Sequence, residues 1–147
     1  MSRGPEANFW SMLRSNLPKN TYATRIENKH GGGVPDVHLL WEGLPVWIEL
    51  KVSKSNAVKV SPHQAAWHMA YHSRGGLSFF LVKALSTGAL VLFEGSEGPN
   101  LLAGGLSEAH GSSFKNSAAL LKALRPRIFD HYANVLGSAA PLDGPRP

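Results

Sequence analysis

The chain has 147 residues, 43% of them hydrophobic, and a formal net charge of +5, so we expect one folded core and a polyanionic partner. The absence of cysteine excludes disulfides and thiolate metal sites, and it fits a cytoplasmic protein. No apolar run is long enough to span a bilayer, and none follows basic residues as in a signal peptide, so we expect no membrane partner.

Apolar periodicity, capping residues and breaks at glycine or proline predict the secondary structure. In chain order we expect a helix over 5–17, strands over 21–28, 36–41 and 46–52, a helix over 62–74, strands over 77–84 and 88–93, and a helix over 116–136. This order predicts an α/β protein with a mixed central sheet flanked by helices.

The remaining stretches read as connections. The polar segment 53–60 and the glycine-bearing segment 95–111 are interpreted as loops, and we expect Pro126 to interrupt the last helix. We expect a single domain over 1–136 and a flexible C-terminal tail over 137–147.

Two acidic residues and a lysine stand where neighbouring strands are predicted to meet. Asp36 opens one strand, and Glu49 lies 13 positions later on the next, so one hairpin would bring the carboxylates together. Lys51 is two positions beyond Glu49, so both side chains share one face of their strand. Carboxylates that converge beside an ammonium suit Mg²⁺ or Mn²⁺ and an attacked phosphodiester, and the carbonyl of Leu50 is a further candidate metal ligand.

Each of these residues also has a purely structural interpretation. Asp36 follows a proline and would suit a turn, and Glu49 and Lys51 would suit an ordinary exposed strand face. The alternate residues from 46 to 52 on that strand are apolar, so the opposite face is expected to be buried. We therefore interpret the polar face as the site.

Two segments resemble the PD-(D/E)XK nuclease superfamily. The first is Gly33-Val34-Pro35-Asp36 followed by Ile48-Glu49-Leu50-Lys51. The second, Ser61-Pro62-His63-Gln64-Ala65-Ala66-Trp67-His68 followed by Gly75-Gly76, is similar to the Holliday-junction resolvase and virus-type replication-repair nuclease branches. The resemblance covers residues 6–93 and implies a restriction-endonuclease-like αβββαβ core, Mg²⁺ or Mn²⁺, cleavage of DNA that is often branched, and a homodimer.

The same resemblance implies a further carboxylate on the first helix and a glutamine at the start of the helix over 62–74. Glu6 is the best match for this carboxylate as a catalytic and metal-binding residue, although it also suits the helix macrodipole; Glu27 is the alternative. Gln64 matches the catalytic glutamine. Gln64 also fits a capping box with Ser61, and because the two roles need different side-chain directions, we expect them to compete.

The stretch from Lys51 to Phe93 contains no Asp or Glu, which predicts a surface that faces nucleic acid. Contacts to phosphates would position DNA without reading its sequence. The candidate DNA-binding residues are Lys54, Lys59, His63, Arg74, Lys122 and Arg125. His68 and His72 are four positions apart on a predicted helix, but without a third ligand in view we expect them to be ordinary surface histidines.

These features predict a metal-dependent DNA endonuclease that acts on branched DNA, as a Holliday-junction resolvase does. Paired nicks need two sites, so this function predicts a symmetric homodimer. The alternative is a structure-specific nuclease for flaps or single strands, or a nicking enzyme, of a phage or repair system. A DNA-binding module without catalysis would require a broken site, whereas Asp36, Glu49 and Lys51 are all present.

Overall fold

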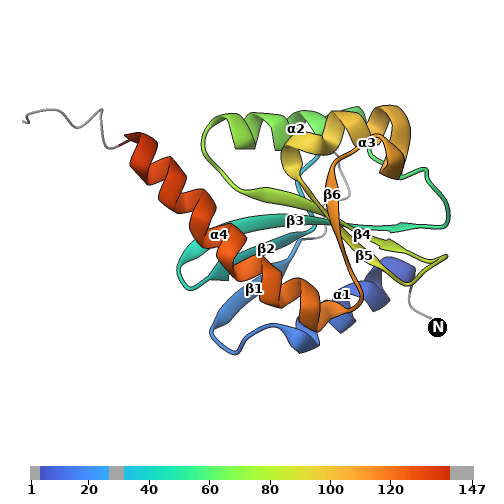
Figure 1. Ribbon diagram of the computed structural model, residues 1–147, viewed down its shortest axis with the longest axis horizontal. Helices are drawn as coiled ribbons and strands as arrows, with labels where there is room; N and C mark the ends of the chain where they lie inside the picture. Colours follow the sequence, from blue (N-terminus) through green and yellow to red (C-terminus); the bar gives the residue numbers. More distant parts are fainter. Residues whose placement is uncertain (1–3, 27–31, 140–147) are drawn as a thin grey trace, which may run out of the picture.

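A six-stranded mixed sheet forms the centre of the protein (Figure 1). The computed structural model describes residues 4–26 and 32–139, and within these ranges the strand order is β1-β2-β3-β4-β5-β6. Strands β3 and β4 run parallel, whereas the other neighbouring pairs are antiparallel. The strands are β1 Thr21–Arg25, β2 Val37–Trp41, β3 Leu44–Ser53, β4 Ser78–Ala84, β5 Leu90–Glu94 and β6 Gly111–Phe114.

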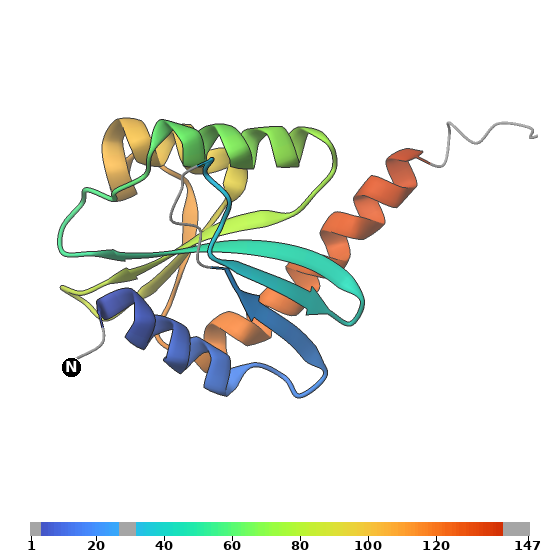
Figure 2. The same cartoon turned by 180° about the vertical axis from the view of Figure 1, so that it is seen from behind.

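Helices cover both faces of this sheet (Figures 1 and 2). α1 (Pro5–Asn16) and α4 (Ser117–Ala139) lie on one face, and α2 (Pro62–Ser73) and α3 (Gly98–Gly104) lie on the other. Because parallel strands need a crossover connection, α2 carries the chain from the end of β3 to the start of β4. The predicted mixed sheet with flanking helices is therefore confirmed.

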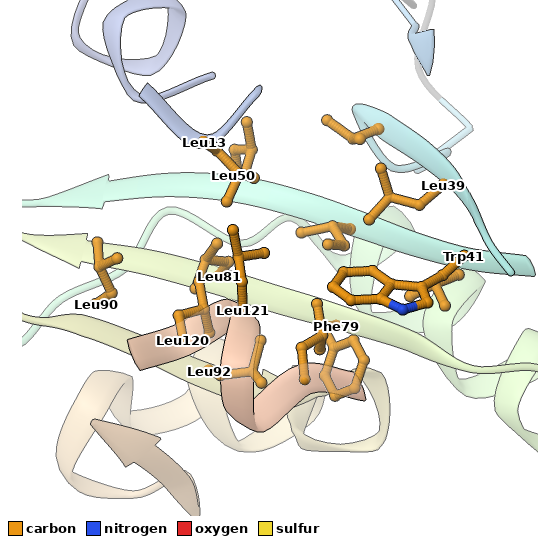
Figure 3. Close-up of a cluster of buried hydrophobic side chains, with 14 of the residues drawn as sticks. Leu13, Leu39, Trp41, Leu50, Phe79, Leu81, Leu90, Leu92, Leu120 and Leu121 are labelled. Carbon is orange, nitrogen blue, oxygen red and sulfur yellow. The ribbon is translucent and has the colours of Figure 1, made fainter. Parts of the chain in front are cut away.

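Strand β3 separates a buried apolar face from a polar one, as its alternating sequence predicts. Val46, Ile48 and Leu50 point toward α1 and α4 and belong to the larger hydrophobic core. Figure 3 shows Leu13 of α1 and two leucines of α4 converging on this side of the sheet, around Leu50. The intervening residues of β3, including Glu49, therefore point toward α2.

A second, smaller core lies on the α2 face beyond Glu49. Its members come from the segment after β3, from α2, from α3 and from the central strands, and they are Val58, Val60, Ala65, Phe80, Val82, Phe93 and Leu101. Phe80 of this cluster pairs with Glu49 across β3 and β4, so the cluster lies beside the polar face of β3.

The interpretation of 95–111 as one long loop was wrong. This segment forms two short 3₁₀ turns, Gly95–Glu97 and Gly105–Ser107, with α3 between them, and then strand β6 at the edge of the sheet. A side chain at Gly98 would lie 3.1 Å from the Cα of Ala65, so this glycine lets α3 pack closely against α2. Glycines that suggested flexibility therefore serve close packing.

Helix α4 continues through Pro126, contrary to the predicted interruption. Pro126 is exposed, so water can bind the carbonyl of Lys122 that loses its helical partner. Leu124 and Ile128, on either side of the proline, are fully buried and hold both parts of the helix to the core. The helix extends to Ala139, three residues into the predicted tail, and the tail from 140 onward lies outside the described residues.

Strand β1 is shorter than predicted. It ends at Arg25, whereas the sequence predicts a strand to Asn28, which lies outside the described residues. None of the helices in the described ranges has the length and apolar character needed to cross a membrane.

Candidate active site

The β2–β3 hairpin brings Asp36 to Glu49, as its spacing predicts. Asp36 lies immediately before β2, and its Oδ2 accepts a hydrogen bond of 3.1 Å from the backbone N–H of Leu50. Glu49 is the residue before Leu50 on β3, and the negative charge of Asp36 acts on it. The backbone of Leu50 thus anchors one carboxylate beside the other.

Glu49 is buried, with 3% of its surface exposed, and two polar side chains contact the same carboxylate oxygen. Lys51 Nζ lies 3.5 Å from Oε2, and Gln64 Nε2 donates a hydrogen bond of 3.2 Å to that atom. The other oxygen, Oε1, is buried and has no hydrogen-bond partner among the described residues. A buried acceptor without a partner is costly, and a cation is one ligand that would satisfy it.

The surroundings of Glu49 favour its protonated form. Burial is the main cause and the charge of Asp36 adds to it; together they outweigh the attraction of Lys51 and raise the pKa of Glu49 to about 8. Near neutral pH the site without a cation therefore holds a proton on Glu49, which a cation must displace in order to bind.

Any affinity of this carboxylate pair for Mn²⁺ or Mg²⁺ should rise steeply with pH, because metal binding requires the ionised carboxylate. Below the pKa of about 8, each pH unit should strengthen binding by up to about tenfold, and the gain should level off above it. Calorimetric titration of the protein with Mn²⁺ from about pH 6 to pH 9 measures this. A Glu49→Gln variant serves as control and should show no such dependence; a flat profile in the natural protein would contradict the argument.

Gln64 performs two roles that the sequence suggested would compete. Its Oε1 accepts a hydrogen bond of 3.0 Å from the backbone N–H of Ser61, while Ser61 Oγ accepts one of 3.1 Å from the backbone N–H of Gln64. Its Nε2 simultaneously donates to Glu49. The expectation of competition was wrong, because the amide has an acceptor end for the capping box and a donor end for the carboxylate.

Two substitutions separate these roles. Ser61→Ala removes the cap alone and should lower the free energy of unfolding by about 1 kcal/mol while leaving metal binding unchanged. Gln64→Ala keeps the backbone N–H that bonds to Ser61 Oγ but removes the Oε1 bond to the N–H of Ser61 and the Nε2 bond to Glu49, so it should also change metal affinity by several-fold. Thermal unfolding and Mn²⁺ titration of both variants test this. Equal metal affinity in the two variants would show that the amide does not act on Glu49.

Gly33 sets the distance between the loop before Asp36 and the start of α2. It adopts a φ of +76°, and an added Cβ would lie 2.2 Å from the backbone oxygen of His63 and 2.8 Å from the backbone nitrogen of Gln64. Gly33 therefore lets the loop before Asp36 pack directly against the backbone at the start of α2, which holds Asp36 and Gln64 near each other.

The predicted third carboxylate does not join this pair. Glu6 is exposed on α1, on the face of the sheet opposite α2, and it lines a separate cavity at the end of β3. Within residues 4–26 and 32–139, no three histidine or acidic side chains lie close enough together to hold a metal ion. The alternative, Glu27, lies outside the described residues.

The predicted DNA-binding residues fall into two groups. Lys54 and Lys59 follow β3, and His63 opens α2, so these three exposed residues lie at the same end of the sheet as the carboxylate pair. The others lie away from this end. They are Arg74 at the far end of α2, Lys122 on α4, and Arg125 on α4, whose guanidinium lies 2.8 Å from Glu42 in the turn between β2 and β3.

His68 is a buried residue that the sequence analysis assigned to the surface. It is 0% exposed, its Nδ1 lies 2.7 Å from Ser78 Oγ, and its ring packs 4.0 Å from that of Phe80 on the strand beside Glu49. Burial lowers the pKa of His68 to about 3, and the charge of Lys51 adds to this effect, so the ring is neutral. Its position three residues after buried Ala65 was the signal for an inward side chain.

Four half-buried rings extend from the carboxylate pair along the α2 face. His38, two residues after Asp36, packs 4.6 Å from Trp47 between ring centroids. Trp47 lies 5.6 Å from Trp67, which stacks on Tyr71 at 4.9 Å with nearly parallel planes. An aromatic surface thus adjoins the polar site.

No protein-family model and no curated protein matches this chain.

Proposed function

We propose that this protein is a metal-dependent nuclease of the PD-(D/E)XK type that hydrolyses phosphodiester bonds in DNA. The observation that carries the proposal is the convergence of Asp36, Glu49 and Lys51 at one end of the β2–β3 hairpin. The element order from α1 to β4, helix-strand-strand-strand-helix-strand, is in keeping with the restriction-endonuclease-like core of that superfamily.

The residues present fit Mg²⁺ or Mn²⁺. Both ions prefer oxygen ligands, and Mg²⁺ needs only one or two protein carboxylates; Asp36 and Glu49 supply them, and the buried Oε1 of Glu49 lacks a partner in the described part of the chain. The carbonyl of Leu50 is a further candidate ligand. When bound, the cation would supply charge for the phosphate and lower the pKa of its water.

Lys51 and Gln64 would support this chemistry from the protein. Lys51 is only partly exposed and contacts Glu49 Oε2, so its ammonium lies where it can orient the attacking water or offset the negative charge of the transition state. Gln64 donates a hydrogen bond to the same oxygen, so α2 fixes the orientation of the Glu49 carboxylate. Lys51→Ala should therefore slow cleavage strongly and change metal affinity little.

Branched DNA is the proposed substrate, cut by a homodimer that presents two sites with two-fold symmetry. The row of rings from His38 to Tyr71 favours a second candidate, cleavage of flaps or single strands, because aromatic side chains stack on unpaired bases. The two candidates share the same catalytic residues and differ in oligomeric state and in the DNA that is cut.

Cleavage of labelled four-way junction, flap, single-stranded and duplex DNA, each with Mg²⁺ or Mn²⁺, tests the proposal. Paired symmetric nicks confined to the junction, together with a dimer in sedimentation, would support the first candidate. Cutting of flaps or single strands by a monomer would support the second. If no DNA is cut with either ion, catalysis is refuted and a DNA-binding module remains.

A further inference from the structure

A cavity of about 670 Å³ lies beside the candidate active site, at the same end of the sheet but next to α1. Its walls come from the first turn of α1, the end of β1, and the end of β3 with the segment that follows it. Val52 and Leu85 give it an apolar surface, and Arg25, Lys54 and Lys59 give it positive charge.

Within residues 4–26 and 32–139, no acidic side chain forms an ion pair with the three cations of this cavity. Among the described residues, the ion pairs join Lys51 to Glu49, His110 to Glu97 and Arg125 to Glu42, and none involves Arg25, Lys54 or Lys59. Glu6 is the one acidic side chain among the described residues of the lining. Three cations against one carboxylate leave an excess of positive charge around a space that is partly apolar.

Arg25 also lines a second cavity of about 330 Å³, together with Arg14 and Trp10 of α1. The two cavities share Arg25 and Ala7, so they adjoin. Positive charge therefore continues from the segment after β3 along the side of α1.

The first cavity begins close to the residues proposed for catalysis. Val52 follows Lys51 directly on β3 but packs with the α1 and α4 core on the opposite face of the sheet, and Lys54 is three residues beyond Lys51, a rise of about 10 Å along an extended chain. Arg25 is the last residue of β1. It pairs with Val37 of β2, which is the residue after Asp36. A nucleic-acid strand at the carboxylates would therefore pass around this end of the sheet, by Lys54, to reach the cavity.

We propose that this cavity is a binding subsite for a nucleotide of the DNA strand, a few positions from the scissile phosphate. The guanidinium of Arg25 and the ammonium groups of Lys54 and Lys59 would donate to phosphate oxygens, and the apolar walls would contact the sugar or base. This inference rests on the proposed nuclease function and adds a site to it. It also gives Glu6 a role in limiting anion binding, in place of the metal-ligand role implied by the resemblance.

The contribution of the positive charge in the cavity is tested by measuring DNA binding without metal. Anisotropy of a labelled single strand of about 16 nucleotides is followed against salt in EDTA. The double variant Arg25→Ala/Lys54→Ala should weaken binding at least several-fold and lower the slope of log K against log[salt] by about 1.4, or about 0.7 per lost contact. Lys19→Ala is the matched control, because Lys19 is an exposed cation before β1, at the other end of that strand, and should change neither quantity.

The cavity itself is tested by filling it without changing its charge. Ala57 is an exposed residue of the lining, and Ala57→Trp should weaken binding of the same strand several-fold. Ala119→Trp, an exposed position on α4, should leave binding unchanged. Circular dichroism and thermal unfolding establish that both variants are folded.

Glu6→Gln should have the opposite effect on DNA binding. Removing this carboxylate should strengthen DNA binding, whereas a metal ligand at this position would lose cleavage with little change in binding. If the natural protein binds DNA but the cavity variants behave as their controls, the subsite is refuted while the nuclease proposal stands. If the natural protein cuts no DNA in the metal-dependent assay but binds through the cavity, the nuclease proposal fails and the nucleic-acid subsite is retained.

Discussion

Asp36→Asn and Glu49→Gln should each reduce DNA cleavage by at least about a thousandfold. Charge stabilisation by a bound cation contributes several kcal/mol to a reaction of this class, and about 4 kcal/mol corresponds to a thousandfold in rate. Each substitution removes one of the two carboxylates that the hairpin brings together. Single-turnover cleavage with Mg²⁺ and with Mn²⁺ measures the loss.

The same two variants should bind DNA at least as well as the natural protein, since Asp36→Asn removes a negative charge near the phosphates and Glu49→Gln replaces a carboxyl group that holds a proton near neutral pH. Asp130→Asn is the matched control, because Asp130 is an exposed acid on α4, and it should leave both cleavage and binding unchanged. Loss of DNA binding in parallel with cleavage would argue that the carboxylates maintain structure and would count against their role as metal ligands.

Gly33→Ala should lower the free energy of unfolding by roughly 2–5 kcal/mol. The left-handed backbone at φ +76° costs an L-residue about 1–2 kcal/mol, and the forced displacement of packed atoms costs about 1–3 kcal/mol more. The added methyl would meet the backbone of His63, so α2 and the loop before Asp36 must move apart. Chemical denaturation gives the stability, and metal titration should show weaker binding as well.

Gly32→Ala separates the cost of the left-handed backbone from the cost of displacing packed atoms. Gly32 has a similar φ of +85°, but an added Cβ there would meet no atom of the described residues within 4 Å. The free energy of unfolding of this variant should fall only by the conformational cost of about 1–2 kcal/mol, and metal binding should be unchanged. Equal losses in the two variants would show that the contact between Gly33 and α2 does not matter for stability.

The sequence by itself determined the local features of the candidate site. The alternation of polar and apolar residues on β3 placed Glu49 and Lys51 on one face and Ile48 and Leu50 in the core, because successive side chains of a strand point to opposite faces. The short connection between β2 and β3 determined that Asp36 meets Glu49. The capping box at Ser61 was also readable, because its bonds join residues three positions apart.

Only the tertiary structure decided how distant segments meet at that site. The family resemblance assigned Glu6 of the first helix to the metal site, but the packing of α1 on the opposite face of the sheet placed it at another cavity. The burial of His68 depends on the segment after β5, since an added Cβ at Gly95 would lie 2.7 Å from His68 Nδ1. Gln64 reaches Glu49 because the crossover brings the start of α2 over β3. Such contacts join residues far apart in the chain, and their geometry follows from the packing of whole elements.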